Sequence, residues 1–406
     1  MSCGPSTVAT RYGTSPQRRM VITDEGFRLF FPLSALYAAL WPVLWIFAHR
    51  FDLPLATTMP PSVWHAHEML IGAFGAALIG FLTTAAPEWT DTEPLRGKML
   101  LALAGLWGVG RVIGLLGWDG AGLIGAFFDL AWLGFLLGYI CWLSWRLQTE
   151  KLLAFAFWVA VLMACVAWAR FAFAAGEPER AASAVRLIGL GFLGLLGLAL
   201  ARITVPVTNL VLDPTEATSP FRPHPGRLHL APGLVLVAMI GEGLGLSAAV
   251  SGFLFIAAGA AFLDRVAEAF IGREAFRTEI LLLAAASGLA GTGLLMAGAA
   301  RLGAPWAETA GLHIAFMGGL GLGILAVFSI AGLLHTGRPL GLPALTKLAA
   351  GLMLGATALR VLPELSPVFD RLGSYLEMSS LLWAAAFLAW LIAYLPLLMR
   401  PAAEPA

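Results

Sequence analysis

The chain has 406 residues and a formal net charge of +1; 59% of its residues are hydrophobic and only 12% are charged. A soluble domain carries about a quarter charged residues. This composition therefore excludes a soluble globular protein, and the mean hydropathy of +0.83 agrees. The small net charge argues against nucleic acid as a partner. The three cysteines are too far apart for a zinc or redox motif.

The hydropathy pattern predicts an all-α, polytopic membrane protein with about twelve transmembrane helices in a single bundle, residues 27–398, embedded in a lipid bilayer. Residues 1–26 are polar and lack an apolar core, which predicts a disordered cytoplasmic tail rather than a signal peptide. Residues 399–406 are predicted to form a second cytoplasmic tail. Only a weak break near Ser247 separates the seventh span from the eighth, so eleven spans remain an alternative. The predicted spans are 27–48, 63–87, 97–116, 121–143, 152–175, 184–211, 230–248, 250–270, 278–300, 305–333, 342–361 and 374–398.

The distribution of Lys and Arg predicts that both termini are cytoplasmic, because short cytoplasmic loops carry an excess of positive charge. In this orientation fifteen such residues face the cytoplasm and four lie in outer loops, which also favours an even number of spans. The outer four are Arg50, Arg180, Arg301 and Arg371. The inner fifteen are Arg11, Arg18, Arg19, Arg96, Lys98, Arg146, Lys151, Arg222, Arg227, Arg265, Arg273, Arg277, Arg338, Lys347 and Arg400.

Four histidines fall within the predicted membrane domain, where ionisable residues are costly and mark functional sites. His65 and His67 lie at the outer end of the second span, and His313 lies roughly 10 Å into the tenth. These three therefore share the outer half of the bilayer. His335 follows His313 by about six helical turns, which places it at the cytoplasmic face.

Two His-x-x-x-Met pairs enter this outer leaflet, His65 with Met69 and His313 with Met317. Each pair puts an imidazole and a thioether on one helix face. These groups suit copper, and both also serve as axial ligands of haem. His67 points about 200° away from His65, so the two either serve separate centres or divide the roles of ligand and support. The alternative is that these histidines only hydrogen-bond neighbouring helices.

Charged residues near the histidines suggest supporting roles. Glu68 is positioned to orient a ligating imidazole. Arg111, Arg170, Arg186 and Arg360 lie near the outer ends of four spans. They either extend toward lipid headgroups or form an anion-binding ring. Such a ring would fit haem propionates, because guanidinium groups pair with carboxylates in a bidentate manner.

Several stretches resemble the NnrS family. They are W-H-A-H-E-M at 64–69 with Gly72, G-F-L-T-T-A at 80–85 and P-E-W-T at 87–90, then Leu312-His313 with Gly318, and H-T-G-R at 335–338. The family consists of twelve-span bacterial membrane proteins linked to nitric oxide metabolism and nitrosative stress, with haem and copper. The resemblance implies a bacterial cytoplasmic membrane location, nitric oxide as a small ligand, and a part in the nitric oxide response or denitrification. It also implies haem, and secondarily copper, at the histidine and methionine cluster. His335 and Arg338 are expected to have a structural or partner-contact role.

Two other functions remain open from the sequence. A secondary transporter would use buried carboxylates such as Glu242, although no clear repeat with paired broken helices is present. A haem–copper oxidase or nitric oxide reductase subunit would need more membrane histidines than this chain offers. No stretch resembles a hydrolytic triad or a nucleotide-binding loop, so catalysis is left undecided.

Overall fold

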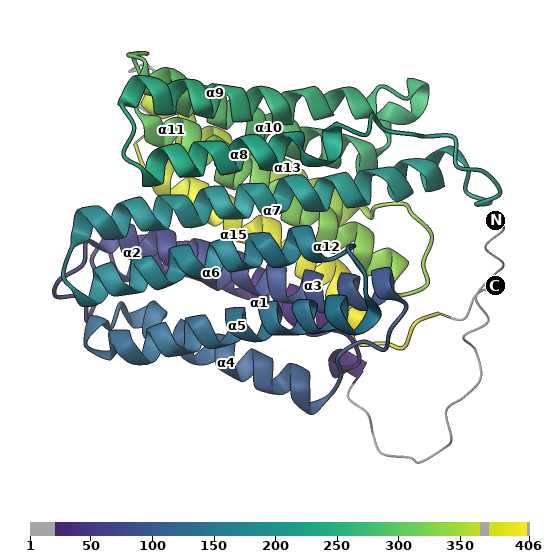
Figure 1. Cartoon of the computed structure of the whole chain (residues 1–406), viewed down its shortest axis with the longest axis horizontal. Helices are drawn as coiled ribbons and strands as arrows, with labels where there is room; N and C mark the ends of the chain where they lie inside the picture. The colour runs from purple at the N-terminus through teal and green to yellow at the C-terminus, as the bar shows by residue number, and fades with distance from the viewer. Residues whose placement is uncertain (1–20, 366–372, 404–406) are drawn as a thin grey trace.

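The computed structural model describes residues 21–365 and 373–403. Within these ranges the chain forms twelve helical segments, which lie side by side, parallel or antiparallel to one another (Figure 1). Predictions on residues 1–20, 366–372 and 404–406, including Arg11, Arg18, Arg19 and Arg371, lie outside the described residues. The segments are Gly26–Ala48 (α1, η2), Pro61–Thr90 (α2, η3, α3), Lys98–Leu116 (α4), Asp119–Leu147 (η4, α5), Leu153–Ala174 (α6), Pro178–Leu212 (α7), Arg227–Gly243 (α8), Ala248–Ala269 (α9, η5), Thr278–Arg301 (α10), Glu308–Leu334 (α11, η7, α12), Ala344–Leu365 (α13) and Tyr375–Leu398 (α15).

Eleven of these segments in the described chain are long and apolar enough to cross a membrane. The exception is α8, whose 17 residues reach only the lower limit for a spanning helix. A real turn separates α8 from α9, since Gly245 adopts a φ of +65° and the Ser247 side chain caps α9 by accepting from the Val250 amide. The polytopic all-α prediction is confirmed. The division between the seventh and eighth predicted spans is present, slightly before its predicted position.

The first and last helices end together at one end of the bundle. Arg28 in α1 donates from Nη1 to the carbonyls of Leu398 and Arg400, at 2.9 and 2.8 Å. The backbone amide of Ala403 donates to the Thr336 carbonyl, at 3.0 Å, beside Gly337. These contacts place the start of α1 and the end of α15 on the same side, as an even number of crossings requires.

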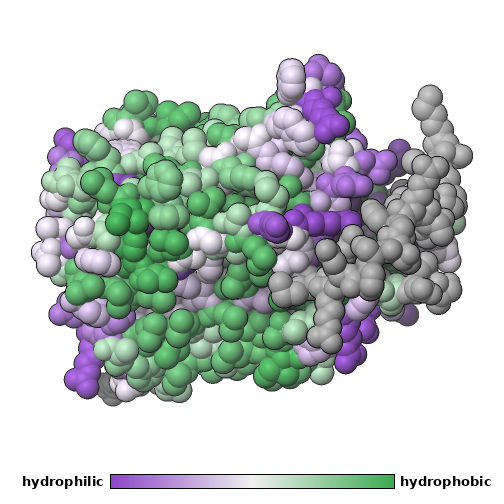
Figure 2. All heavy atoms as spheres, turned by 90° about the horizontal axis from the view of Figure 1, so that it is seen from below, coloured by the Kyte–Doolittle hydropathy of each residue, from purple (hydrophilic) through white to green (hydrophobic). Residues whose placement is uncertain are grey.

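Three segments form the centre of the bundle: α2–α3, α7 and α11–α12. In the most apolar 18-residue stretch of each of these segments, 83% to 89% is buried inside the bundle. The corresponding share in every other candidate span is 61% or less. The outer helices present large apolar side chains outward, such as Leu123, Phe171 and Ile392. Figure 2 shows the resulting apolar band around the middle of the bundle, with hydrophilic side chains toward its two ends. This is the surface that a lipid bilayer solvates.

Close backbone contact between α10 and α11 depends on two glycines. A Cβ atom on Gly311 would lie 2.4 Å from the Ala297 nitrogen, and one on Gly293 would lie 2.3 Å from the Ala315 nitrogen. Small residues allow helices in lipid to approach in this way. His313 follows Gly311 by two residues, so this contact also fixes the position of that histidine.

Gly311→Val is therefore expected to force α11 away from α10 and to destabilise the protein by about 3 kcal/mol through overpacking. Thermal unfolding of the detergent-solubilised protein measures the effect. Gly351→Val in α13 is the matched control, because nothing lies within 4 Å of a Cβ atom at that position. Equal melting temperatures for the two variants would show that the α10–α11 contact tolerates a side chain.

Candidate functional site

A cavity of about 520 Å³ opens between the helices at the end of the bundle where α2 and α11 lie (Figure 1). Its size falls within the range of small-molecule and cofactor sites, about 300 to 1,000 Å³. Its walls are mainly aromatic and aliphatic, and its polar lining comprises two histidines, two arginines, Thr309 and three serines. The lining comes from α1 and η2, α2 and η3, α7, α11 and η7, α13 and α15.

Three segments of the cavity wall have the wide π-helical geometry, which often marks functional sites. They are η2 (Leu44–Ala48), η3 (Glu68–Phe74) and η7 (Ile314–Gly321). The segment η3 begins directly after His67 and η7 directly after His313. All three contribute to the lining, for example through Trp45, Met69 and Met317. The sequence did not predict this local geometry.

Both His-x-x-x-Met pairs line this one cavity: His65 with Met69, and His313 with Met317. His313 Nδ1 lies 2.8 Å from the Thr309 carbonyl oxygen. Donation by Nδ1 to that carbonyl leaves Nε2 as the nitrogen with a free lone pair, the arrangement usual for ligating histidines. The helices thus bring together two imidazoles and two thioethers that are far apart in the sequence.

His65 is held by two tryptophans of the first span. Its ring stacks on Trp45 and Trp41, with centroid distances of 5.0 and 6.2 Å. The buried Nδ1 of His65 has no hydrogen-bond partner among the described residues. Buried polar atoms are rarely left unpaired in folded proteins, so this nitrogen points to a missing ligand or solvent partner.

Two guanidinium groups reach the same cavity. Arg360 in α13 lines it and pairs with Glu364 one turn further along. Arg186 in α7 also lines it, with Nη1 at 3.4 Å from Glu242 Oε2 and 3.7 Å from Glu308 Oε1. An anionic group in the cavity would therefore compete with these glutamates for the two guanidinium groups.

Arg111 and Arg170 lie elsewhere, in a buried ion network. Asp129 is at its centre and pairs with Nη2 of Arg111 and with Arg170, whose Nε lies 3.0 Å from Asp129 Oδ2. Arg111 also donates from Nη1 to Glu68 Oε2 at 2.7 Å. Two carboxylates thus balance two guanidiniums, and all four side chains are at most 3% exposed. Neither arginine lines the cavity.

His67 belongs to this buried network as well. Its Nδ1 lies 3.0 Å from Glu68 Oε1, and its Nε2 lies 3.5 Å from Asp129 Oδ2. The hydroxyl of Tyr37 donates to Glu68 Oε2 at 2.5 Å. Glu68 therefore orients an imidazole, namely that of His67. His65 and His67 face different sites, and within the described ranges no cluster of three or more His, Cys, Asp or Glu side chains is arranged to hold a metal ion.

The His335–Arg338 segment directly follows α12 (Leu322–Leu334), whereas His313 is the last residue of α11 (Glu308–His313). The two histidines therefore lie far apart along the Glu308–Leu334 segment. The His335 ring packs on Phe27 at a centroid distance of 5.2 Å, and its Nε2 lies 3.7 Å from Glu88 Oε2. Arg338 is exposed. Gly337 adopts a φ of +70°, and a Cβ atom there would lie 2.6 Å from the Ala403 carbonyl oxygen. The segment ends α12 and holds the chain that follows α15.

Comparison with known families gives one match that spans nearly the whole chain. The model described as NnrS protein matches residues 21–402. This range contains the cavity, the buried ion network and the His335–Arg338 segment. No protein of curated function matches the sequence.

Proposed function

The chain belongs to the NnrS family, and we propose that it binds haem in the cavity lined by His65 and His313. The observation that carries this proposal is that two histidines from separate central helices line one cavity of about 520 Å³. Histidine is a common axial ligand of haem iron. The mainly apolar walls suit the faces of a porphyrin. Arg186 and Arg360 would bind its carboxylates in place of the glutamates that they contact here.

The residues have separate parts in this proposal. His65 and His313 would hold the iron, with His313 oriented by the Thr309 carbonyl and His65 by the two stacked tryptophans. The apolar walls limit access of water. Haem iron held by two histidines has no open position, so a small diatomic ligand would bind by replacing one of the two imidazoles. Nitric oxide is the ligand we propose, with a role in the nitric oxide response, nitrosative-stress protection or denitrification at a bacterial cytoplasmic membrane.

Copper is the second candidate occupant. Met69 and Met317 also line the cavity, and imidazole with thioether is a ligand set that copper accepts. A cavity of this volume is much larger than a single ion needs, which favours haem. The two methionine variants Met69→Leu and Met317→Leu distinguish the two occupants. They would lower the copper content of the protein and leave its haem content largely unchanged.

The transporter hypothesis has weaker support. Glu242, the carboxylate on which it would depend, does not line the cavity. It pairs with Arg301, whose Nη2 lies 3.0 Å from Glu242 Oε2 and 2.7 Å from Glu308 Oε1. Glu242 therefore belongs to an ion-paired cluster beside the cavity rather than to a free binding site.

The test is the absorption spectrum and metal content of the protein purified from cells with ample haem supply. We expect a Soret band with stoichiometric iron, and a shift of that band when nitric oxide is added. A preparation with neither a Soret band nor copper would contradict the proposal. A Soret band that nitric oxide leaves unchanged would contradict the assigned ligand while retaining the cofactor.

A further inference from the structure

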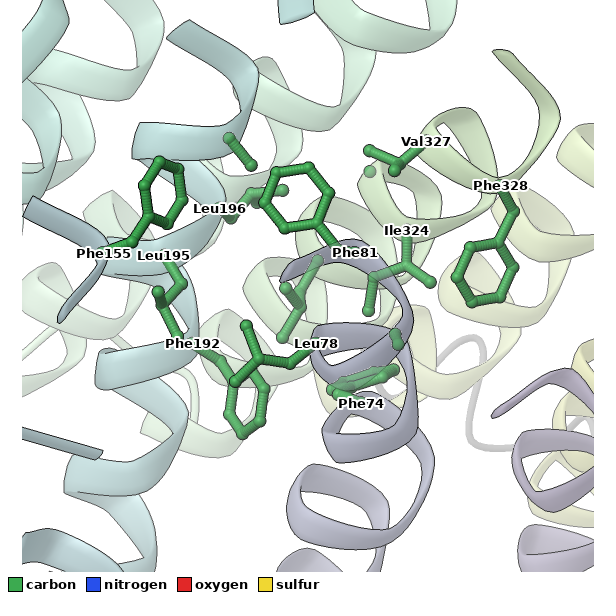
Figure 3. Close-up of a pocket in the computed structure, with 14 residues that line it drawn as sticks. Phe74, Leu78, Phe81, Phe155, Phe192, Leu195, Leu196, Ile324, Val327 and Phe328 are labelled. Atoms are coloured by element: carbon green, nitrogen blue, oxygen red, sulfur yellow. The ribbon is translucent and has the colours of Figure 1, made fainter. Parts of the chain in front are cut away.

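A second cavity, of about 60 Å³, lies between the helices. Figure 3 shows its wall, in which the drawn side chains contain only carbon. Its lining includes Phe74, Phe155, Phe192, Leu196, Ile324 and Val327. Every lining residue is buried except Phe81, which is partly exposed. We call this space the apolar cavity.

The apolar cavity continues the larger cavity along the same three central helices. Phe74 lines both. On α7 the lining passes from Val185 to Phe192, and on the η7–α12 segment it passes from Met317 to Leu320. These steps correspond to one or two helical turns. The two cavities are therefore neighbours, and the Phe74 ring lies between them.

The wall chemistry decides what the apolar cavity can hold. A water molecule needs two to four polar partners, and apolar cavities in proteins stay dry yet accept benzene or xenon. The volume exceeds the roughly 10 to 15 Å³ that one water needs, and it is well below the roughly 150 Å³ of a cavity that binds benzene. Its ligand is therefore apolar and has only two or three heavy atoms.

We propose that the apolar cavity is a binding site for small apolar gas molecules, which exchange with the larger cavity past the Phe74 side chain. Apolar gases dissolve preferentially in the apolar interior of a membrane, where the spanning helices of this bundle lie. This proposal rests on the proposed function only in one respect, namely that the gas moves to a haem in the larger cavity. Binding in the apolar cavity itself requires no haem.

Xenon is the probe for the test. Haem-free protein in detergent is exposed to xenon under pressure, and the bound gas is followed by xenon NMR and by anomalous scattering in crystals. We expect one xenon site bounded by Phe74, Leu196 and Ile324. Ala199→Leu and Ala77→Val, at two lining positions, should each fill the cavity and remove the bound signal.

Ala102→Leu is the matched control, because Ala102 is exposed on α4 and lies away from both cavities. This variant should bind xenon as the parent protein does. Phe74→Ala should merge the two cavities and speed xenon exchange. An absence of bound xenon in the parent protein, or binding at the parent level in both filled variants, would overturn the proposal. A missing Soret band would leave this result unaffected, so the two proposals fail independently.

Discussion

Replacement of His313 by alanine is expected to lower the haem affinity of the protein by more than about 100-fold, and replacement of His65 should have a similar effect. Loss of a residue that only supports a ligand commonly reduces metal affinity about 10- to 100-fold, and loss of a ligand itself exceeds this. Both imidazoles line the same cavity. The measurement is Soret absorbance per chain after purification with ample haem.

Two other histidines provide matched controls for this prediction. His335 directly follows α12, far from His313, and its ring packs on Phe27, so His335→Ala should retain the parent haem content. His67 pairs with Glu68 outside the cavity wall, so His67→Ala should affect stability more than haem content. Equal haem in the His65, His313 and His335 variants would show that the cavity does not hold the cofactor.

Asp129→Asn is expected to have the largest effect on stability, about 3 to 5 kcal/mol. Asp129 is fully buried and pairs with both Arg111 and Arg170. Removing its charge leaves two buried guanidiniums with the single charge of Glu68. Breaking a buried ion pair on one side is strongly destabilising, because an uncompensated charge remains. Denaturant or thermal unfolding in detergent measures the change in free energy.

A double variant tests whether charge balance is the cause. Asp129→Leu combined with Arg170→Met removes one charge of each sign and leaves the Glu68–Arg111 pair intact, at 2.7 Å. Replacing a buried pair with apolar residues is often nearly neutral, so much of the lost stability should return.

Asp264→Asn is the control, since the Asp264 side chain is 43% exposed beside Arg227. Exposed pairs contribute about 0 to 1 kcal/mol. Similar losses for the Asp129 and Asp264 variants would exclude this explanation.

The ends of the membrane spans could be predicted from the sequence to within six residues. Span length follows from the thickness of the bilayer and from local composition, which are properties of a single segment. The predicted tenth span, 305–333, corresponds to Glu308–Leu334, and the predicted second, 63–87, to Pro61–Thr90. The division between the seventh and eighth spans was the hardest to predict, because only a weak break near Ser247 separates them in the sequence.

The site could be predicted only in part. From the depth of each residue along its helix and the i, i+4 spacing, we predicted that His65, Met69, His313 and Met317 lie in the same leaflet. The four side chains line one cavity. The sequence could not show which neighbour each helix face meets. Arg111 and Arg170 share a depth with the histidines but turn toward Asp129. Such rotations depend on packing between segments that are distant in the chain.

The π-helical segments η3 and η7 could not be predicted for a related reason. A π-helical turn differs from an α-helical turn by one inserted residue, and local composition hardly distinguishes the two. The i, i+4 spacing of Trp41 and Trp45 puts two large rings on one face of the first span. This spacing is the sequence feature that could have predicted an aromatic partner for a histidine. Both rings stack on His65.

The three central segments have a consequence for biogenesis. They are the second, sixth and tenth helical segments in chain order, and the cavity wall includes residues from Pro42 to Trp383. While the ribosome is still synthesising the chain, the second and sixth segments enter the membrane without the tenth. Their cavity-facing polar side chains must then be shielded by lipid headgroups, water or an insertion chaperone. Any ligand of the cavity can be loaded only after nearly the whole chain has been translated.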